Sequence, residues 1–294
     1  MRIKGVWVPI ITPFKEGEID YNSYKKLIDH FISNGVDGIM PLGTTGEFPT
    51  IEKDEYFELI DKTVEYIDGR LPVFIGLGGN YTKEVIEKIA KVEQYDVDGV
   101  LSVVPYYNKP DQRGIYKHFQ RIAESTDLQV LIYNIPDRTG QNIENYTILR
   151  LAEMDNIVGI KDVARDILQS MELLYNKPDN FSVLTGEDIF FYTYLLNGGD
   201  GGVLASSHVL SLDFIKIYKL IKQGAIDQAL NKWKKLFKII PNFFKEPNPA
   251  PLKYCLYKKG LISSYECRSP LEEVSDELKS ELDKINQLIS IQEI

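Results

Sequence analysis

Eight short apolar segments recur along the chain at intervals of 20 to 34 residues, and this spacing limits the possible folds more than any other feature. The segments are residues 6–11, 38–42, 72–77, 99–104, 129–135, 157–161, 181–185 and 201–205. Between them lie longer stretches with the periodicity of an amphipathic helix, such as 24–32 and 84–90. Apolar strands that alternate with helices are typical of a parallel sheet buried on both faces. Eight such units favour an α/β protein whose sheet closes into a (β/α)₈ TIM barrel over an open doubly wound sheet.

The chain after the eighth segment has helical periodicity only. Residues 212–223 are predicted to complete the eighth unit, and 225–244, 251–260 and 270–289 are predicted as further helices. No stretch rich in Ser or Gly separates these helices from the preceding units. The sequence therefore predicts a barrel domain over residues 1–224 and a C-terminal helical extension over residues 225–294, packed on the barrel.

The composition argues against several classes of partner. With 34 Lys and Arg against 43 Asp and Glu, the net charge is −9, whereas nucleic-acid binding requires a basic surface. Cys255 and Cys267 cannot build a disulfide framework, and three scattered histidines argue against a transition-metal site. No apolar stretch of ~18 residues is present, and the run at 6–11 is too short for a signal peptide. We expect a soluble cytoplasmic protein that binds neither nucleic acid nor membrane.

Active sites of (β/α)₈ barrels lie at the carboxyl ends of the strands, and the sixth predicted strand ends in a lysine. Because side chains alternate along a strand, Lys161 shares a face with Gly159, opposite Val158 and Ile160. If the glycine face points inward, the lysine amine lies in the barrel mouth. Desolvation there would favour the neutral amine, which attacks a carbonyl to form a Schiff base. The alternative is a strand-end lysine that extends to solvent.

The fifth predicted strand ends beside Lys161 and carries Tyr133, followed in the next loop by Arg138. The Tyr133 phenol could exchange protons with a carbinolamine. The Arg138 guanidinium could hold a carboxylate through two parallel hydrogen bonds. The alternatives are a tyrosine of the core and an arginine of the surface.

Two further strand ends carry polar groups. After the second strand, Thr44 and Thr45 lie between glycines in 43–47, where backbone N–H groups and hydroxyls could hold a carboxylate. The alternative is that these glycines only permit a tight turn and that Thr50 caps the next helix. The fourth strand ends in Tyr106 and Tyr107. Their phenols either take part in the site or only pack against neighbouring residues. The glycine-rich run at 198–202 precedes its strand, which is the wrong end for phosphate binding.

Taken together, four motifs resemble the dihydrodipicolinate synthase/N-acetylneuraminate lyase family of pyruvate-dependent Schiff-base aldolases. The motifs are Gly-Thr-Thr-Gly-Glu at 43–47, Pro-Tyr-Tyr-Asn-Lys-Pro at 105–110, Tyr-Asn-Ile-Pro-Asp-Arg-Thr-Gly at 133–140 and Gly-Ile-Lys at 159–161. Each motif ends a predicted strand, and the resemblance extends from residues 10–14 to 246–249. Single motifs of this kind are weak, but their order and positions together are specific.

The resemblance implies a role for each candidate residue. Lys161 would form an imine with pyruvate, and the imine would acidify the pyruvate methyl group so that an enamine attacks an aldehyde. Thr44, Tyr107 and Tyr133 would relay protons, with Tyr107 supplied by a neighbouring subunit. Substrate would be bound by Thr45, Arg138, Gly186 and Val203, the last through its carbonyl. The resemblance implies no metal or dissociable cofactor, and a homotetramer built from tight dimers.

The motifs specify the second substrate less closely than they specify pyruvate. Thr44, Thr45, Tyr107 and Arg138 together resemble the synthase branch, whose members condense pyruvate with L-aspartate-4-semialdehyde in lysine and diaminopimelate biosynthesis. In that branch the lysine is usually followed by Glu-Ala, then Thr or Ser, then Gly, whereas here residues 162–165 are Asp-Val-Ala-Arg. An acidic residue after the lysine also occurs in 2-keto-3-deoxy sugar-acid aldolases, which are the alternative. A catalytically silent pyruvate-binding paralogue is a further alternative, against which the intact Lys161 and Tyr133 speak.

Feedback inhibition by lysine is expected to be weak or absent. Positions that match the lysine pocket of sensitive family members keep Asn80, Glu84 and Tyr106, but they carry Phe48, Pro49, Lys53 and Tyr56. The Lys53 cation would repel a lysine ligand.

Overall fold

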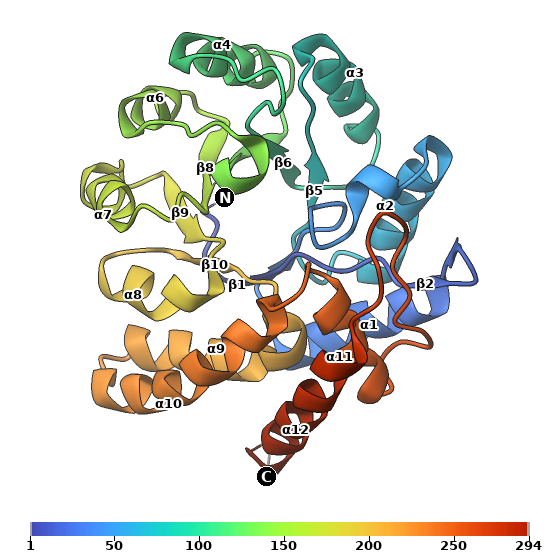
Figure 1. Cartoon of the computed structure of the whole chain (residues 1–294). Helices are drawn as coiled ribbons and strands as arrows, with labels where there is room; N and C mark the ends of the chain where they lie inside the picture. Colours follow the sequence, from blue (N-terminus) through green and yellow to red (C-terminus); the bar gives the residue numbers. More distant parts are fainter. Residues whose placement is uncertain (1, 293–294) are drawn as a thin grey trace. The chain divides into compact units, whose positions relative to one another are not determined.

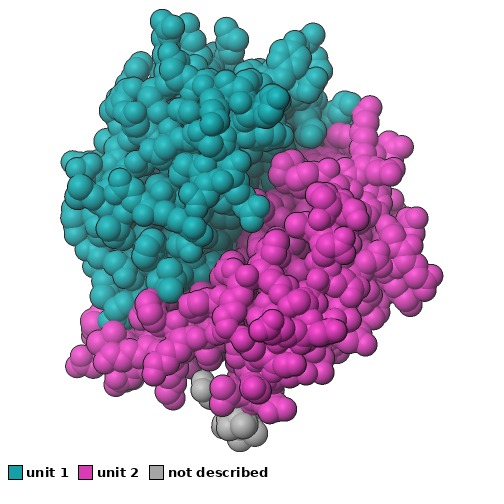
Figure 2. Space-filling model, viewed as in Figure 1, with its two compact units in different colours: residues 1–7, 37–40, 72–204 teal, residues 8–36, 41–71, 205–294 magenta. Residues whose placement is uncertain are grey.

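The computed structural model describes residues 2–292. The chain divides into two compact units (Figure 2). Unit 1 comprises residues 1–7, 37–40 and 72–204, and unit 2 comprises residues 8–36, 41–71 and 205–294. Each unit is therefore assembled from segments that are far apart in the sequence.

All eight predicted strands are present and form one parallel sheet (Figure 1). They are β1 (Gly5–Val8), β4 (Gly38–Ile39), β5 (Phe74–Leu77), β6 (Gly99–Val103), β7 (Gln129–Asn134), β8 (Ile157–Asp162), β9 (Ser182–Thr185) and β10 (Gly201–Val203). Their order in the sheet is β4-β1-β10-β9-β8-β7-β6-β5. A parallel bridge between Ile39 and Val73 joins the two ends of this order and closes the sheet. The predicted (β/α)₈ barrel is thus confirmed.

Helices follow the strands of unit 1 and lie outside the ring of strands in Figure 1. They are α3 (Thr82–Val92), α4 (Gln112–Ala123), α5 (Pro136–Thr139), α6 (Asn145–Leu151), α7 (Ile167–Asn176), the 3₁₀ helix η2 (Asp188–Phe190) and α8 (Phe191–Leu196). Side-chain caps start two of them: Asp111 accepts from the Gly114 N–H, and Asp166 accepts from the N–H groups of Leu168 and Gln169. These bonds satisfy amide groups that the first helical turn leaves without partners.

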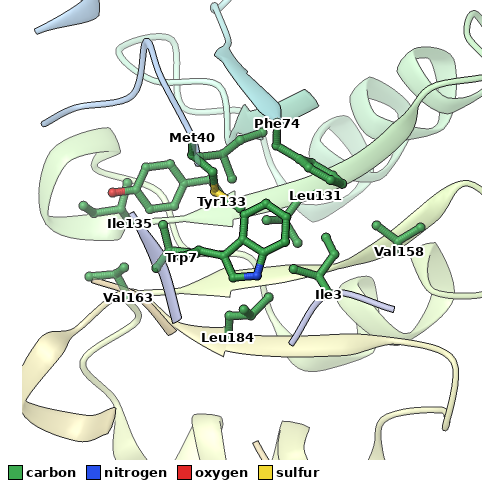
Figure 3. Packing of buried hydrophobic residues seen from close by; sticks show 12 residues of the cluster. Ile3, Trp7, Met40, Phe74, Leu131, Tyr133, Ile135, Val158, Val163 and Leu184 are labelled. Carbon is green, nitrogen blue, oxygen red and sulfur yellow. The ribbon is translucent and has the colours of Figure 1, made fainter. Parts of the chain in front are cut away.

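Large side chains fill the interior of the barrel, as Figure 3 shows. The Trp7 ring lies among Met40, Leu131 and Leu184, and it meets the Phe74 ring edge-on with 5.5 Å between the ring centroids. Tyr133 belongs to the same buried cluster. The interior is therefore packed, and only its carboxyl-terminal end is available for chemistry.

Unit 2 contains helices and one short hairpin. Its elements are β2 (Phe14–Lys15), β3 (Glu18–Ile19), α1 (Tyr21–Asn34), the 3₁₀ helix η1 (Phe48–Thr50), α2 (Lys53–Ile67), α9 (Ser207–Lys222), α10 (Ile226–Ile239), the 3₁₀ helix η3 (Ile240–Phe244), α11 (Ala250–Lys258) and α12 (Asp276–Gln292). Helix α10 packs against α9, and α12 packs against α11. Within residues 2–292, no helix combines the length and the apolar character that a membrane span requires.

The structure corrects several predicted boundaries in the second half of the chain. Helix α9 begins at Ser207 rather than at 212, with a non-helical Leu210 inside it. The predicted helix at 225–244 ends as an α-helix at Ile239, because Pro241 lacks the N–H that a continuing helix needs. Helix α12 begins at Asp276 rather than at 270, and the Ser275 hydroxyl accepts from the Leu278 N–H as its cap.

A buried histidine connects two segments of unit 2. The His208 Nδ1–H donates to the Ala205 carbonyl oxygen at 2.7 Å, and Nε2 accepts from the Ile11 N–H at 3.0 Å. Both bonds require a neutral ring with its proton on Nδ1. Burial lowers the pKa of His208 to about 4. The folded state therefore favours the uncharged form of this side chain.

We expect acid to destabilise the protein through this residue. The unfolded chain binds the His208 proton near pH ~6.5, whereas the folded chain binds it only near pH 4. The stabilisation is complete above pH ~6.5 and is lost as pH falls through 4, by about 3 kcal/mol in total. Denaturant unfolding of wild type and His208→Gln between pH 7.5 and 4.5 should show a shallower pH dependence in the variant.

A matched control for this measurement is Phe31→Leu. The Phe31 ring is fully buried and lies edge-on against His208, with 5.4 Å between the ring centroids. This change removes packing without a titrating group, so it should lower stability equally at each pH. Parallel pH profiles for wild type and His208→Gln would contradict the assignment.

Candidate active site

The strand register places Lys161 on the inner face of the barrel. Lys161 is opposite Tyr133 on β7 and opposite Leu184 on β9. Neighbouring residues of parallel strands project to the same side, and both partners belong to the interior cluster. Only 6% of the Lys161 surface is exposed, and its Nζ lies 4.2 Å from the centroid of the Tyr133 ring. The glycine face of β8 thus points inward, and Lys161 does not extend to solvent.

A register shift upstream produces this arrangement. Val130 is opposite Ile157, but the next residue, Leu131, is opposite Gly159, so that Val158 has no Cα partner on β7. The predicted position of Val158 on the outer face is wrong, because Val158 belongs to the interior cluster (Figure 3). Such an extra residue in one strand is a bulge, which often redirects the side chains near an active site. The sequence contained no sign of this bulge, because Val158 fits the apolar run of the strand.

Glycine at the end of β9 provides space for the Lys161 stem. A Cβ added to Gly186 would lie 2.6 Å from Cε of Lys161 and 2.6 Å from Cγ2 of Val163. The Gly186 N–H donates to the Asp162 carbonyl oxygen at 2.8 Å, which holds the two strand ends together. Gly186 therefore shapes the surroundings of the lysine without a side chain of its own.

Asp162 points to the opposite side of β8, away from Lys161. Its carboxylate accepts from the Tyr194 hydroxyl at 2.5 Å and from the Ser170 hydroxyl at 2.7 Å, and it also accepts from the Ala164 N–H at 3.1 Å. Burial, together with the Asp162 charge, raises the pKa of Tyr194. This buried network fixes the backbone next to the lysine.

The other candidates of unit 1 differ in burial. Val203 on β10 is buried in the interior cluster, opposite Trp7. Tyr107 is 88% exposed and has a positive φ of 70°, which is uncommon for a residue other than glycine. Arg138 is exposed on the one-turn helix α5. The structure therefore brings Lys161, Tyr133 and Gly186 together, and it leaves Tyr107 and Arg138 at the surface of the chain.

Thr44 and Thr45 belong to a tight turn of unit 2. The Glu47 N–H donates to the Thr44 carbonyl oxygen at 3.1 Å, and the buried Thr45 hydroxyl accepts from Nδ2 of Asn248 at 2.9 Å. Asn248 was not predicted from the sequence as a partner of this turn. The Thr50 hydroxyl donates to the Glu47 carbonyl oxygen, and Glu52 is the residue that caps α2, so the predicted capping role of Thr50 is wrong.

A fully buried ion pair anchors the same turn. Nζ of Lys253 lies 2.5 Å from Oε1 of Glu47, and neither side chain is exposed. Oε2 of Glu47 accepts from the backbone N–H of Arg268 at 3.0 Å. The Lys253 ammonium also donates to the Glu266 carbonyl oxygen, and it lies over the Phe14 ring. Burial lowers the pKa of Lys253, and the Glu47 carboxylate opposes that change. No local sequence pattern indicated this pair, because its members are 206 positions apart.

Removing one partner of this pair should destabilise the protein strongly. Lys253→Met leaves the Glu47 carboxylate buried without its cation, which costs about 3–5 kcal/mol. The double variant Lys253→Met/Glu47→Gln should recover part of that loss. The measurement is the free energy of denaturant unfolding.

The surface pair between Lys25 and Asp29 on α1 provides the control, because water surrounds both of its side chains. Lys25→Ala should cost less than about 1 kcal/mol. A Lys253→Met variant as stable as Lys25→Ala would disprove the anchoring role of the buried pair.

Together, these features define a (β/α)₈ barrel with a buried lysine at the carboxyl end of its sixth strand, next to a tyrosine ring. Within residues 2–292, no three His, Cys, Asp or Glu side chains are grouped so that they could hold a metal ion.

Comparison with known proteins assigns the chain to a family. The model of the dihydrodipicolinate synthetase family matches residues 2–289. The chain is 53% identical to 4-hydroxy-tetrahydrodipicolinate synthase 2 of Clostridium acetobutylicum, over 97% of this chain and 99% of that protein. It is 39% identical to 4-hydroxy-tetrahydrodipicolinate synthase of Oceanobacillus iheyensis, over 97% of both chains. The crystal structure of dihydrodipicolinate synthase from Thermotoga maritima superposes with a TM-score of 0.95, at 36% identity and over 99% of both chains. The chain belongs to the dihydrodipicolinate synthetase family.

Proposed function

We propose that this chain is a lyase that condenses pyruvate with L-aspartate-4-semialdehyde to 4-hydroxy-tetrahydrodipicolinate, the product in the names of its relatives. The observation that carries the proposal is the buried amine of Lys161 beside the Tyr133 ring, in a chain that matches those relatives over nearly its full length. The reaction serves lysine and diaminopimelate biosynthesis.

The proposed chemistry starts at Lys161. Its amine attacks the keto carbon of pyruvate, and loss of water from the carbinolamine gives an imine. The imine withdraws electrons from the pyruvate methyl group, which loses a proton and becomes the nucleophilic carbon of an enamine. That carbon attacks the aldehyde of the second substrate. The amino group of that substrate then attacks the imine carbon, which closes the ring of the product and releases the Lys161 amine.

Three hydroxyl groups would move the protons. The Tyr133 ring lies beside the amine, with 4.2 Å between Nζ and the ring centroid, and Thr44 and Tyr107 would extend the relay. A phenol that is 88% exposed in one chain suits a residue that serves the site of a neighbouring subunit, which supports our proposal for Tyr107. On this basis we also propose a homotetramer built from tight dimers.

Four residues would bind the substrates. Thr45 would hold the pyruvate carboxylate, Gly186 would leave room for pyruvate beside the lysine stem, and the Val203 carbonyl would border the pocket. The exposed Arg138 guanidinium would hold the carboxylate of the semialdehyde through two parallel hydrogen bonds.

The orientation of Asp162 bears on the alternative, a 2-keto-3-deoxy sugar-acid aldolase. In the sequence, the departure of residues 162–165 from the usual synthase run weakened the synthase assignment, because an acidic residue after the lysine also occurs in those aldolases. In the structure, the Asp162 carboxylate is occupied by Tyr194 and Ser170 on the outer side of β8. The carboxylate is thus engaged away from Lys161, which supports the synthase over the aldolase.

The domain organisation and the cellular setting are also proposals. We propose residues 1–224 as the catalytic domain and residues 225–294 as a helical extension. Cys255 and Cys267 are both free, which supports a reducing compartment such as the cytoplasm.

Pyruvate consumption with L-aspartate-4-semialdehyde, run beside cleavage of 2-keto-3-deoxygluconate, tests the function. We expect turnover with the semialdehyde, and a loss of at least about tenfold in kcat/KM in Arg138→Ala, because a charged hydrogen-bonding partner is removed. Borohydride with pyruvate should trap an adduct on Lys161 that mass spectrometry detects. Release of pyruvate from the sugar acid alone would identify an aldolase. The absence of both the adduct and any turnover would identify a silent paralogue.

A second measurement tests the space around the lysine. In Gly186→Ala, the new methyl group displaces the Lys161 stem, and we expect borohydride trapping with pyruvate to slow by about 100-fold. Gly198→Ala is the control: no atom lies within 4 Å of its added Cβ, although this glycine, unlike Gly186, has a positive φ. Equal trapping rates in the two variants would contradict the role of Gly186.

A further inference from the structure

One arginine bridges the ends of three neighbouring barrel strands. Arg165 lies in the loop after β8, and its Nε donates to Oε2 of Glu187 at 2.9 Å. Its Nη1 lies 2.8 Å from Oδ2 of Asp137. Asp137 follows β7, and Glu187 follows β9. A single guanidinium therefore connects the three loops that surround the end of the Lys161 strand.

The partners of Arg165 are next to the residues proposed to bind substrate. Asp137 immediately precedes Arg138, and Glu187 immediately follows Gly186. The arginine itself is four positions beyond Lys161. The bridge thus lies on the rim where the second substrate would enter.

The backbone conformation at Arg165 supports a functional role for its side chain. Its φ is +56°, in the left-handed region that residues with a Cβ rarely adopt. Glycine would occupy this position with less strain. Residues held in such conformations occur disproportionately at functional sites, so an observed outlier supports a hypothesis of function.

The charges of Asp137 and Glu187 explain the effect of an arginine at position 165. Without Arg165, the Asp137 and Glu187 carboxylates would flank the approach to Arg138 and repel an anionic substrate. The guanidinium compensates both charges at hydrogen-bond distance. Hydrogen bonding and the charge of Glu187, followed by the charge of Asp137, raise the pKa of Arg165, which therefore stays cationic.

We propose that Arg165 is a positioning and specificity-determining residue for the second substrate. By compensating Asp137 and Glu187, it leaves the positive charge of Arg138 available to an aldehyde that carries a carboxylate. This inference rests on the proposed condensation of pyruvate with such an aldehyde. Arg165 does not contact the reacting atoms, so its effect is on the KM of the aldehyde.

The first variant removes the charge of Arg165 without adding strain to the backbone. Arg165→Gly removes the guanidinium and relieves the positive φ. We expect this variant to raise the KM for L-aspartate-4-semialdehyde about five- to tenfold at low salt, the combined size of two exposed ion pairs. The KM for pyruvate, kcat and the rate of borohydride trapping on Lys161 should stay unchanged. The difference should shrink in 0.5 M salt, because Arg165 and Asp137 are exposed to solvent and Glu187 is partly exposed.

A triple variant tests the proposed cause. Arg165→Gly/Asp137→Asn/Glu187→Gln has no uncompensated carboxylates, so its KM for the semialdehyde should return towards the wild-type value. Lys83→Ala is the matched control, since it removes a surface cation from a pair with Glu87 on α3. This control should leave every constant unchanged.

Each other outcome overturns the proposal. An unchanged KM in Arg165→Gly would show that the bridge has no effect on the substrate. A KM that stays high in the triple variant, or a parallel rise for pyruvate, would show that Arg165 only maintains loop structure. Wild-type protein that does not consume the semialdehyde would refute the proposed function and this inference with it. Turnover by wild type with an unchanged KM in the variant refutes the inference alone.

Discussion

The pairing of β7 with β8 is the constraint on which the candidate site depends. Side chains alternate strictly along a strand, so a shift by one residue exchanges the inner and outer faces. If β7 and β8 paired continuously, with Val158 opposite Leu131, Tyr133 would be opposite Ile160, and Lys161 would share the outer face with Asn134. The bulge turns the amine inward and sends Asp162 outward to its two hydroxyl partners. One unpaired residue thus decides which polar side chain lies on the inner face of the barrel.

Charged groups serve the two units in different ways. In unit 2, the Glu47 and Lys253 charges are removed from water entirely, which makes their pairing obligatory and fixes the turn that carries Thr44 and Thr45. In unit 1, the Arg165 side chain remains 60% exposed, so water and salt weaken its pairs. The buried pair therefore contributes to rigidity, whereas the exposed pairs set the electrostatic surroundings of a ligand.

The sequence was sufficient to predict the parts of the molecule that depend on residues close together along the chain. The period of two along strands and the regular spacing of apolar runs were sufficient for all eight strands, and the alternation placed Lys161 with Gly159. Features that depend on distant residues were missed, such as the contacts of Glu47 with Lys253 and of Thr45 with Asn248. The hairpin of β2 and β3 was also missed, since each strand has two residues and only Glu16 and Gly17, both with positive φ, form its turn. The start of α12 depends on a serine cap that its periodicity does not indicate.

The position of β1 has a consequence for biosynthesis. This strand lies between β4 and β10, and Gly5 pairs with Gly201, 196 residues later. A ribosome that adds 5–20 residues per second needs about 10–40 s to synthesise that interval. One edge of β1 stays without its partner strand throughout this time, and unpaired strand edges promote aggregation. The nascent chain therefore passes through a long vulnerable period, in which chaperones that shield apolar strands would raise the yield of closed barrels.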